Sequence, residues 1–170
     1  MEISKKILLL GDPRLYEISR EIKQDEMREL EPVVHALHEA LMDFRAQHQR
    51  GRAIAAPQLG VELRLIYMHI DKPVVFINPE FIWKSAELIE VWDDCFSFPE
   101  LLVKVHRHKA CRVKYRDLDW KEHVCEFNGD LSELFQHEYD HLDGILAVMR
   151  AVDGKSFAWA SQKHHVGFTR

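Results

Sequence analysis

The sequence predicts an α+β fold with mostly antiparallel strands. Three observations carry this prediction. An amphipathic helical pattern occupies the first third of the 170-residue chain, six short apolar runs follow it, and a second helical pattern covers residues 130–149. At this length one domain is expected, and it is large enough to bury a proper core.

The first helix is predicted from apolar residues that recur at spacings of three and four, and it should end near Gly51. Pro32 fits only within a first turn, which moves the expected start to Glu31. The apolar positions are Met27, Leu30, Val33, Val34, Leu37, Ala40, Leu41 and Phe44.

After a loop from Gly51 to Gly60, short runs rich in β-branched and aromatic residues predict strands, because turn-forming or charged residues bound each one. The predicted strands are 63–70, 74–78, 88–92, 101–105, 111–115 and 123–127.

The second helix is expected from Asp130 to Met149, directly after Gly129. Residues after Val152 show no firm periodicity, so we expect an irregular tail. The predicted organisation is a single catalytic domain over residues 1–152, followed by a C-terminal tail over residues 153–170.

Composition and charge narrow the class of protein. Apolar residues make up 46% and charged residues 30%, an ordinary globular balance. A formal charge of −5 disfavours a nucleic-acid partner, which usually requires a basic surface. No apolar run reaches membrane-spanning length. Three cysteines without a signal peptide predict reduced thiols and a cytoplasmic location.

The segment His137-Glu138-Tyr139-Asp140-His141 carries the most chemical information. Residues four apart share one face of a helix, so His137 and His141 can bind one metal ion. Glu138 can then act as general base on a water at that metal. Asp140 should point away from the metal, either on the helix surface or as a hydrogen-bonding residue behind it.

A catalytic site of this kind needs a third protein ligand and an open position. A metzincin-type protease would place histidine where Ala147 stands. A gluzincin-type protease needs a downstream glutamate, and none follows His141. Cys95 is an upstream candidate, although a lone cysteine is by itself more often a small core residue.

Three segments together resemble the peptide deformylase family. Its motif Gly-x-Gly-x-Ala-Ala-x-Gln appears as residues 51–58, and Glu-Gly-Cys-Leu-Ser appears as Asp93-Asp94-Cys95-Phe96-Ser97. The third motif, Gln-His-Glu-x-Asp-His, is intact from Gln136 to His141. The order and spacing match over residues 7–150. This resemblance implies antiparallel sheets around a central metal-binding helix that carries His-Glu-x-x-His.

The resemblance also implies an activity: metal-dependent removal of a formyl group from an N-formyl amine, by default an N-formylmethionyl peptide. Cys95, His137 and His141 would bind Fe(II), with Zn, Ni or Co as alternatives. Glu138 would transfer protons, and Gln58 with the backbone N–H of Phe96 would hold the oxyanion. Implied partners are N-formylated peptides or small molecules, including nascent chains at the ribosome.

The chain departs from the family pattern at several positions. Ala53 replaces a glycine, so it would be strained if its φ were positive. Asp93 replaces a glutamate that pairs with an arginine in the family, and Arg107 is the expected partner here. Asp94 replaces a glycine and adds a carboxylate beside Cys95.

The pocket departs most. By resemblance it comprises Gly51, Arg52, Ala53, Asp130, Glu133 and Leu134, and family members carry aliphatic residues where Arg52, Asp130 and Glu133 stand. Charges there oppose burial of a methionine side chain. Either Arg52 pairs internally with Asp130 or Glu133, or the pocket binds a polar or charged N-acyl substrate. A further alternative is a non-catalytic binding protein, against which the retained Glu138 argues.

Overall fold

The computed structural model describes residues 3–4 and 6–168, which form two antiparallel sheets, two α-helices and several short 3-10 helices. The helices are α1 (Glu31–His48) and α2 (Asp130–Leu142). The strands are β1 (Ala53–Ala55), β2 (Leu65–His69), β3 (Pro73–Lys84), β4 (Leu88–Asp94), β5 (Leu101–His108), β6 (Ala110–Arg116), β7 (Glu122–Asn128) and β8 (Phe157–Trp159). The 3-10 helices are η1 (Pro13–Tyr16), η2 (Gln24–Glu29), η3 (Ala56–Leu59), η4 (Ala147–Arg150) and η5 (Ala160–His165).

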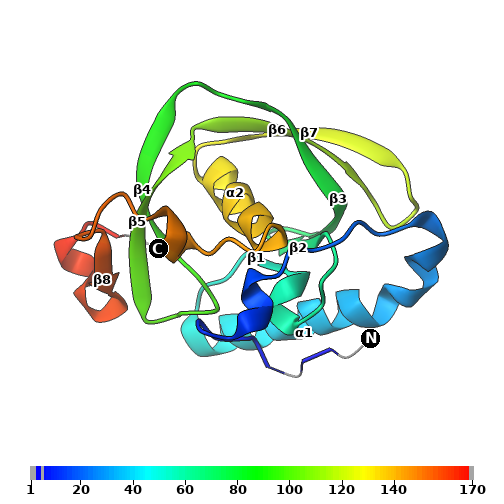
Figure 1. Ribbon diagram of the computed structural model, residues 1–170, viewed down its shortest axis with the longest axis horizontal. Coiled ribbons are helices and arrows are strands. Elements are labelled where there is room, and N and C mark those ends of the chain that lie inside the picture. Colours follow the sequence, from blue (N-terminus) through cyan, green and yellow to red (C-terminus); the bar gives the residue numbers. More distant parts are fainter. Residues whose placement is uncertain (1–2, 5, 169–170) are drawn as a thin grey trace.

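The larger sheet has the strand order β1-β2-β3-β6-β7, and the smaller has the order β4-β5-β8. All pairings between these strands are antiparallel, as predicted. Figure 1 shows α2 enclosed by strands, with β6 and β7 on one side and β1 and β2 on the other. The arrangement therefore surrounds the residues of α2 with sheet.

Residues at the two ends of helix α1 explain where it begins and where it ends. Pro32 lies in its first turn, which confirms the predicted start at Glu31. Gln49 ends it in the left-handed conformation, with φ of 56°. Its buried side chains lie three or four residues apart, and the first three of them pack against the sheet. They are Val33, Leu37, Leu41 and Phe44.

The β1–β2 part of the larger sheet is buried on both faces, because the two helices cover opposite sides. Ile54 and Tyr67 belong to the apolar cluster that includes α1. Ala55 and Ile66 belong to the cluster that includes Phe135 of α2. This alternation is the period of two expected for strands. The small alanine side chains of β1 let α2 pack close to it.

Helix α2 ends at Leu142, so the predicted end at Met149 is wrong. Gly144 adopts φ of 68°, and a Cβ there would lie 2.4 Å from the carbonyl oxygen of Tyr16. The helix ends in the usual way at this left-handed glycine, where Ile145 N–H donates to the Asp140 carbonyl at 2.9 Å. A new short helix, η4, then begins at Ala147. Gly144 is therefore a local stop signal that the prediction passed over, and its close approach to Tyr16 is a second reason for glycine at this position.

Two short strands were not predicted. β1 lies inside the expected loop, and β8 lies inside the expected irregular tail, where Leu101 of β5 pairs with Trp159. β3 also continues beyond Asn78, whose φ of 47° coincides with an irregularity in the pairing with β6. A three-residue strand has too little sequence to show periodicity, and its neighbours in the sheet stabilise it.

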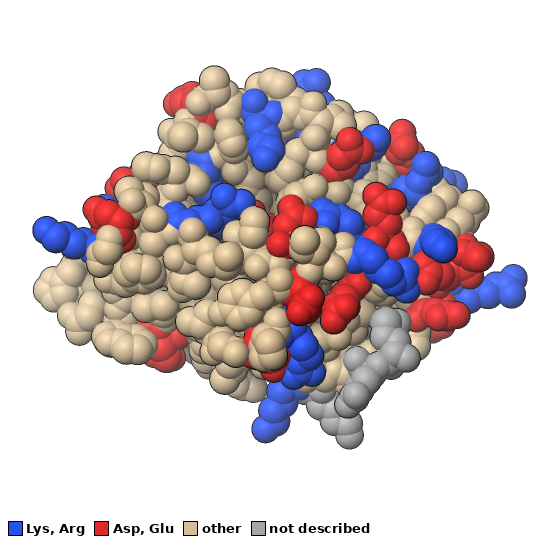
Figure 2. Space-filling view, in the orientation of Figure 1, with Lys and Arg blue, Asp and Glu red and all other residues tan. Residues whose placement is uncertain are grey.

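The surface carries interspersed charges. Figure 2 shows acidic and basic side chains beside one another on the face in view, and cross-strand ion pairs such as Lys114–Glu80, at 2.8 Å, occur on the larger sheet. Within residues 3–4 and 6–168, neither helix has the length and apolarity that crossing a membrane requires.

Candidate metal centre

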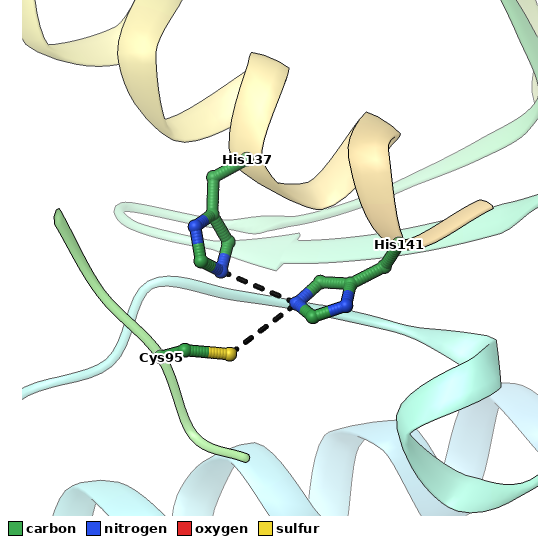
Figure 3. A group of neighbouring side chains, drawn as sticks. All are labelled: Cys95, His137 and His141. Carbon is green, nitrogen blue, oxygen red and sulfur yellow. Dashed lines mark hydrogen bonds between the residues drawn. The ribbon is translucent and has the colours of Figure 1, made fainter. Parts of the chain in front are cut away.

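Cys95, His137 and His141 form a buried cluster (Figure 3). Nε2 of His141 lies 3.3 Å from Sγ of Cys95 and 3.2 Å from Nε2 of His137. One ligand atom from each residue falls within 4.8 Å of the other two. The structure thus brings together the three predicted metal ligands, and their thiol and imidazole groups can bind a divalent metal.

Two separate segments supply the cluster. The histidines lie one turn apart on α2, whereas Cys95 follows directly after β4. The chain turns tightly there, with Phe98 N–H donating to the Cys95 carbonyl at 3.2 Å and Ser97 N–H donating to its Sγ at 3.4 Å. These bonds orient the sulfur toward the helix.

Asp93 lies behind the cluster and orients it. Nδ1 of His137 donates to Asp93 at 2.9 Å, which leaves Nε2 directed at the other ligands. Arg107 donates to the same carboxylate at 2.8 Å, so the predicted Asp93–Arg107 pair is confirmed. Burial alone would raise the pKa of Asp93, but the charges of His137 and Arg107 outweigh it and lower that pKa.

The same guanidinium extends the network to α2. Arg107 also pairs with Asp140, which accepts from Nε and Nη2 of Arg150 at 2.6 and 2.7 Å. Asp140 is buried, so of its two predicted placements the hydrogen-bonding one is correct and the helix-surface one is wrong. The pairing joins η4 to α2 directly behind the histidines.

The two histidines differ in their affinity for a proton. Burial and the neighbouring His137 lower the pKa of His141 well below its usual value. Burial also disfavours charge on His137, but Asp93 and Cys95 raise its pKa well above the usual value. Their Nε2 atoms lie within hydrogen-bond distance. Metal binding would displace a proton from this position, as it does in other histidine sites.

Glu138 is buried beside the cluster, and burial raises the pKa of its carboxyl to about 7. Among the described residues, its Oε2 has no hydrogen-bond partner. A buried carboxylate oxygen without a partner is costly unless a ligand or water occupies the space before it. Because Glu138 also lines an open cavity, this oxygen fits a site that receives water or substrate.

Gln58 lies beside the cluster, in η3. Its Oε1 accepts from Ala55 N–H at 3.1 Å, which determines the orientation of the amide. Its Nε2 therefore faces Sγ of Cys95 at 3.6 Å and Oγ of Ser97 at 3.2 Å. A fixed N–H donor thus lies beside the cluster, as an oxyanion-binding role requires.

A cavity of about 520 Å³ opens over these groups. Every predicted site residue except His141 contributes to its walls. The predicted residues in the walls are Gly51, Arg52, Ala53, Gln58, Cys95, Phe96, Asp130, Glu133, Leu134, His137 and Glu138.

The motif glycine and alanine have different roles in this cavity. Gly51 has φ of 125°, and a Cβ there would lie 2.8 Å from the ring of Phe96. That ring stacks on Phe44 of α1 at 3.8 Å. Ala53 lies in β1 and is not among the residues with positive φ, so the expected condition for strain does not arise.

The charged cavity residues pair across it. Arg52 forms an ion pair with Asp130 through both terminal nitrogens of its guanidinium. This confirms one of the internal pairings considered for Arg52. Arg50 pairs with Asp94 at 3.2 Å and donates to the Pro99 carbonyl at 2.5 Å.

Sequence reasoning missed three arginines near the site. Arg45 donates to the carbonyls of Gly51 and His69, Arg50 pairs with Asp94, and Arg150 holds Asp140. Only Arg50 could have been found from the sequence, because it directly precedes the first motif. Arg45 and Arg150 contact residues brought near by tertiary folding, so no local spacing identifies them.

A Cys-His-His cluster beside a buried glutamate, at the base of a cavity and surrounded by antiparallel sheets, defines a metallohydrolase. The family model described as Polypeptide deformylase matches residues 4–157. The chain belongs to the polypeptide deformylase family, and it is accordingly a metal-dependent hydrolase that removes formyl groups from N-formylated peptides.

Individual relatives agree. A peptide deformylase of Pseudothermotoga lettingae is 36% identical over 154 residues, covering 91% of this chain and 86% of the relative. The crystal structure of peptide deformylase from Thermotoga maritima has a TM-score of 0.79 at 30% identity, covering 90% of this chain and all of that one. A Met-Ala-Ser-bound class I type b peptide deformylase from Acinetobacter baumannii has a TM-score of 0.78 at 27% identity, covering 88% and 99%.

Proposed function

We propose that this chain hydrolyses the formamide of N-formylmethionyl peptides at the Cys95–His137–His141 centre, and that α2 is the central metal-binding helix of the fold. One observation carries the proposal. Three ligand atoms from two segments converge within 4.8 Å, next to a buried glutamate, Glu138, whose Oε2 has no partner among the described residues. A binding protein without turnover has no need of that glutamate.

The proposed ion is Fe(II), with Zn, Ni or Co as alternatives, because one thiolate and two imidazoles suit all four. Three protein ligands leave a position for a reactant. When bound, the ion supplies a Lewis acid that polarises the formyl carbonyl and makes an attacking water more acidic. Asp93 and Arg107 hold His137 in the orientation that this ligand set requires.

Glu138 is the proposed proton carrier. It takes a proton from the attacking water and later delivers one to the leaving amine, so that formate and a free amino terminus result. Its burial disfavours the charged carboxylate, which favours a base able to give the proton back. Glu138 lines the cavity, which supports this role.

Gln58 and Phe96 are proposed to stabilise the oxyanion. The Gln58 amide is already held by Ala55 N–H, so its Nε2 needs no reorganisation to donate. Phe96 follows Cys95 directly, and stacking on Phe44 holds its ring, which restrains the backbone N–H proposed as the second donor.

The substrate is proposed to lie against Gly51, Arg52, Ala53, Asp130, Glu133 and Leu134, which all line the cavity. Arg52 and Asp130 pair with each other, so their two charges compensate one another in the cavity wall. This pairing supports the default substrate, an N-formylmethionyl peptide. Binding of Met-Ala-Ser by the Acinetobacter baumannii enzyme is consistent with a peptide occupying the equivalent cavity. Glu133, a buried carboxylate, favours the second candidate, an N-formyl substrate with a polar or charged side chain.

The remaining proposals concern organisation and setting. Residues 1–152 are proposed as one catalytic domain and 153–170 as an appended tail, which β8 joins to β5. Cys95, Cys111 and Cys125 are all free thiols. They support the proposed cytoplasmic setting, in which the enzyme meets N-formylated chains emerging from the ribosome.

The test is formate release from formyl-Met-Ala-Ser by anaerobically prepared protein loaded with Fe(II) or Ni(II). We expect release that follows metal content and that Glu138→Gln abolishes, because the variant keeps the size of the side chain and loses the base. Equal metal content in both proteins is the control. If fully loaded protein releases no formate from a broad panel of formyl peptides, the proposal fails.

A further inference from the structure

A network of alternating basic and acidic side chains runs from the surface to the metal centre. In order, it comprises Arg150, Asp140, Arg107, Asp93 and His137. The Arg150 side chain is 42% exposed, whereas the other four are exposed by 9% or less. This charge network therefore has one end in solvent and the other at a metal ligand, and the proposed mechanism gives its outer end no role.

The outer contact of the charge network is a two-pronged one. Nε and Nη2 of Arg150 donate to the two carboxylate oxygens of Asp140 at 2.6 and 2.7 Å. Among the described residues, Oδ1 of Asp140 accepts no other hydrogen bond. An ion pair between two exposed side chains contributes little, but this carboxylate is buried, and a buried charge that loses its partner is costly. Arg150 therefore fixes the orientation of the Asp140 carboxylate.

Arg107 transmits that orientation inward. Its Nη1 donates to Asp140 and its Nη2 to Asp93, while its Nε has no hydrogen-bond partner among the described residues. The guanidinium is thus held by the two carboxylates, and because it is buried, water cannot readily replace either of them. Asp93 in turn accepts from Nδ1 of His137 at 2.9 Å. A change at Asp140 is therefore felt at the metal ligand.

The segment that carries Arg150 is attached to the strand that carries Arg107. Ala151 forms a β-bridge with β5, and Val152 N–H donates to the Lys104 carbonyl of the same strand at 3.1 Å. These backbone contacts lie next to both ends of the charge network's outer half. They hold the two arginines in fixed positions on either side of Asp140.

Resting on the metal centre of the proposed function, we propose that Arg150 is a positioning residue for the metal ligand His137, acting through the three charged side chains between them. Arg150 contacts neither the metal ligands nor the cavity. Its contribution is to keep the His137 ring in the orientation that metal binding requires, since groups that hydrogen-bond to a ligand histidine restrict its rotation and raise metal affinity.

Metal affinity without turnover is the first test. Zn(II) is titrated against a chromophoric chelator in the presence of each protein. Arg150→Met, which keeps the apolar stem and removes the guanidinium, should lower the affinity about threefold to tenfold. Arg150→Lys keeps the charge and should restore part of the loss. Arg112→Met, an exposed arginine paired with Glu126 at 3.2 Å, is the matched control and should bind normally. Unchanged or higher affinity in Arg150→Met overturns the inference.

A double-mutant cycle tests the route. If Arg150 acts through Asp93, then Arg150→Met should weaken Zn(II) binding much less in a protein that already carries Asp93→Asn than in the unaltered protein. Two losses that simply multiply would show that the residues act independently, which overturns the inference. Circular dichroism verifies that each variant folds, and Arg150→Lys serves for the cycle if Arg150→Met does not.

The NMR signal of the His137 ring separates positioning from a general loss of stability. In metal-free protein labelled with ¹⁵N at histidine, the Nδ1–H signal of His137 should shift or broaden in Arg150→Met. His123, which pairs with Asp117 at 2.6 Å outside the charge network, is the internal reference and should not change. A His137 signal that stays unchanged overturns the inference, as does an equal change in both rings.

These measurements also separate the inference from the proposed function, because none of them requires turnover. Formate release by the unaltered enzyme, together with unaltered metal affinity in Arg150→Met, overturns the inference and leaves the proposed function standing. If loaded protein hydrolyses no formyl peptide, the proposed function fails, and the affinities and the His137 signal still decide whether Arg150 positions the ligand.

Discussion

Asp93 accepts a hydrogen bond from Nδ1 of His137 at 2.9 Å and one from Arg107 at 2.8 Å, so a single carboxylate links a metal ligand to a buried guanidinium. Glutamate, the family residue at this position, is one methylene longer. Because β4 delivers Asp93 beside α2, the shorter side chain suffices.

Asp93→Asn tests this relationship. The amide keeps the size of the side chain but removes the charge that orients His137 and balances Arg107. We expect metal affinity to fall about 10–100-fold, as measured by competition with a chromophoric chelator. Asp117→Asn, in the turn between β6 and β7 and away from the cluster, is the control and should bind metal normally. Unchanged affinity in Asp93→Asn would show that the pair does not support the metal site.

Gln58→Met tests the oxyanion role. The substitution preserves length and apolar packing but removes the donor that faces Cys95. We expect kcat for formate release to fall about 10²–10³-fold, with a much smaller change in KM, because the lost interaction belongs to the transition state. Steady-state kinetics at equal metal content measures this. A variant that changes KM alone would assign Gln58 to substrate binding instead.

Gly51→Ala tests the conformation of the first motif. With φ of 125° and a Cβ that would lie 2.8 Å from the Phe96 ring, alanine must strain the backbone or displace that ring. We expect a loss of about 1–3 kcal/mol in the free energy of unfolding, measured by urea denaturation, together with reduced activity.

Gly154→Ala is the matched control for that substitution. Its φ is not positive, and a Cβ there would meet no atom within 4 Å. Stability should therefore stay the same or rise slightly, since alanine restricts the unfolded chain. Equal effects of the two substitutions would contradict the steric argument.

An ion pair in the N-terminal region provides a test of pH dependence. Hydrogen bonds from the Arg20 side chain and Lys23 N–H lower the pKa of Glu26 from 4.5 to about 2. Because the folded-state pKa is depressed, its stabilising contribution is present above pH 4.5 and is lost as the pH falls toward 2. A carboxyl NMR titration should show the low pKa, and Arg20→Gln should raise it. A Glu26 pKa of 4.5 in the unaltered protein would contradict the pairing.

The sequence by itself determined the parts of the site that depend on local spacing. His137 and His141 share a helix face because they are four residues apart, and Glu138 accompanies them wherever the helix lies. The start of α1 followed from Pro32, and short runs rich in β-branched and aromatic residues predicted six of the eight strands in the described part of the chain. These features depend on backbone geometry and burial period, which neighbouring residues specify.

Only the tertiary structure decided what depends on residues distant in sequence. Gly144 has no room for a side chain because the Tyr16 carbonyl lies against it. Arg52 reaches Asp130 across 78 positions, and Cys95 meets His141 across 46. The positions of these partners result from packing the two sheets around α2, and local periodicity contains no information about such packing. The metal-binding motif of α2 could thus be predicted from the sequence, whereas the pairing of charges in the cavity could be known only from the folded chain.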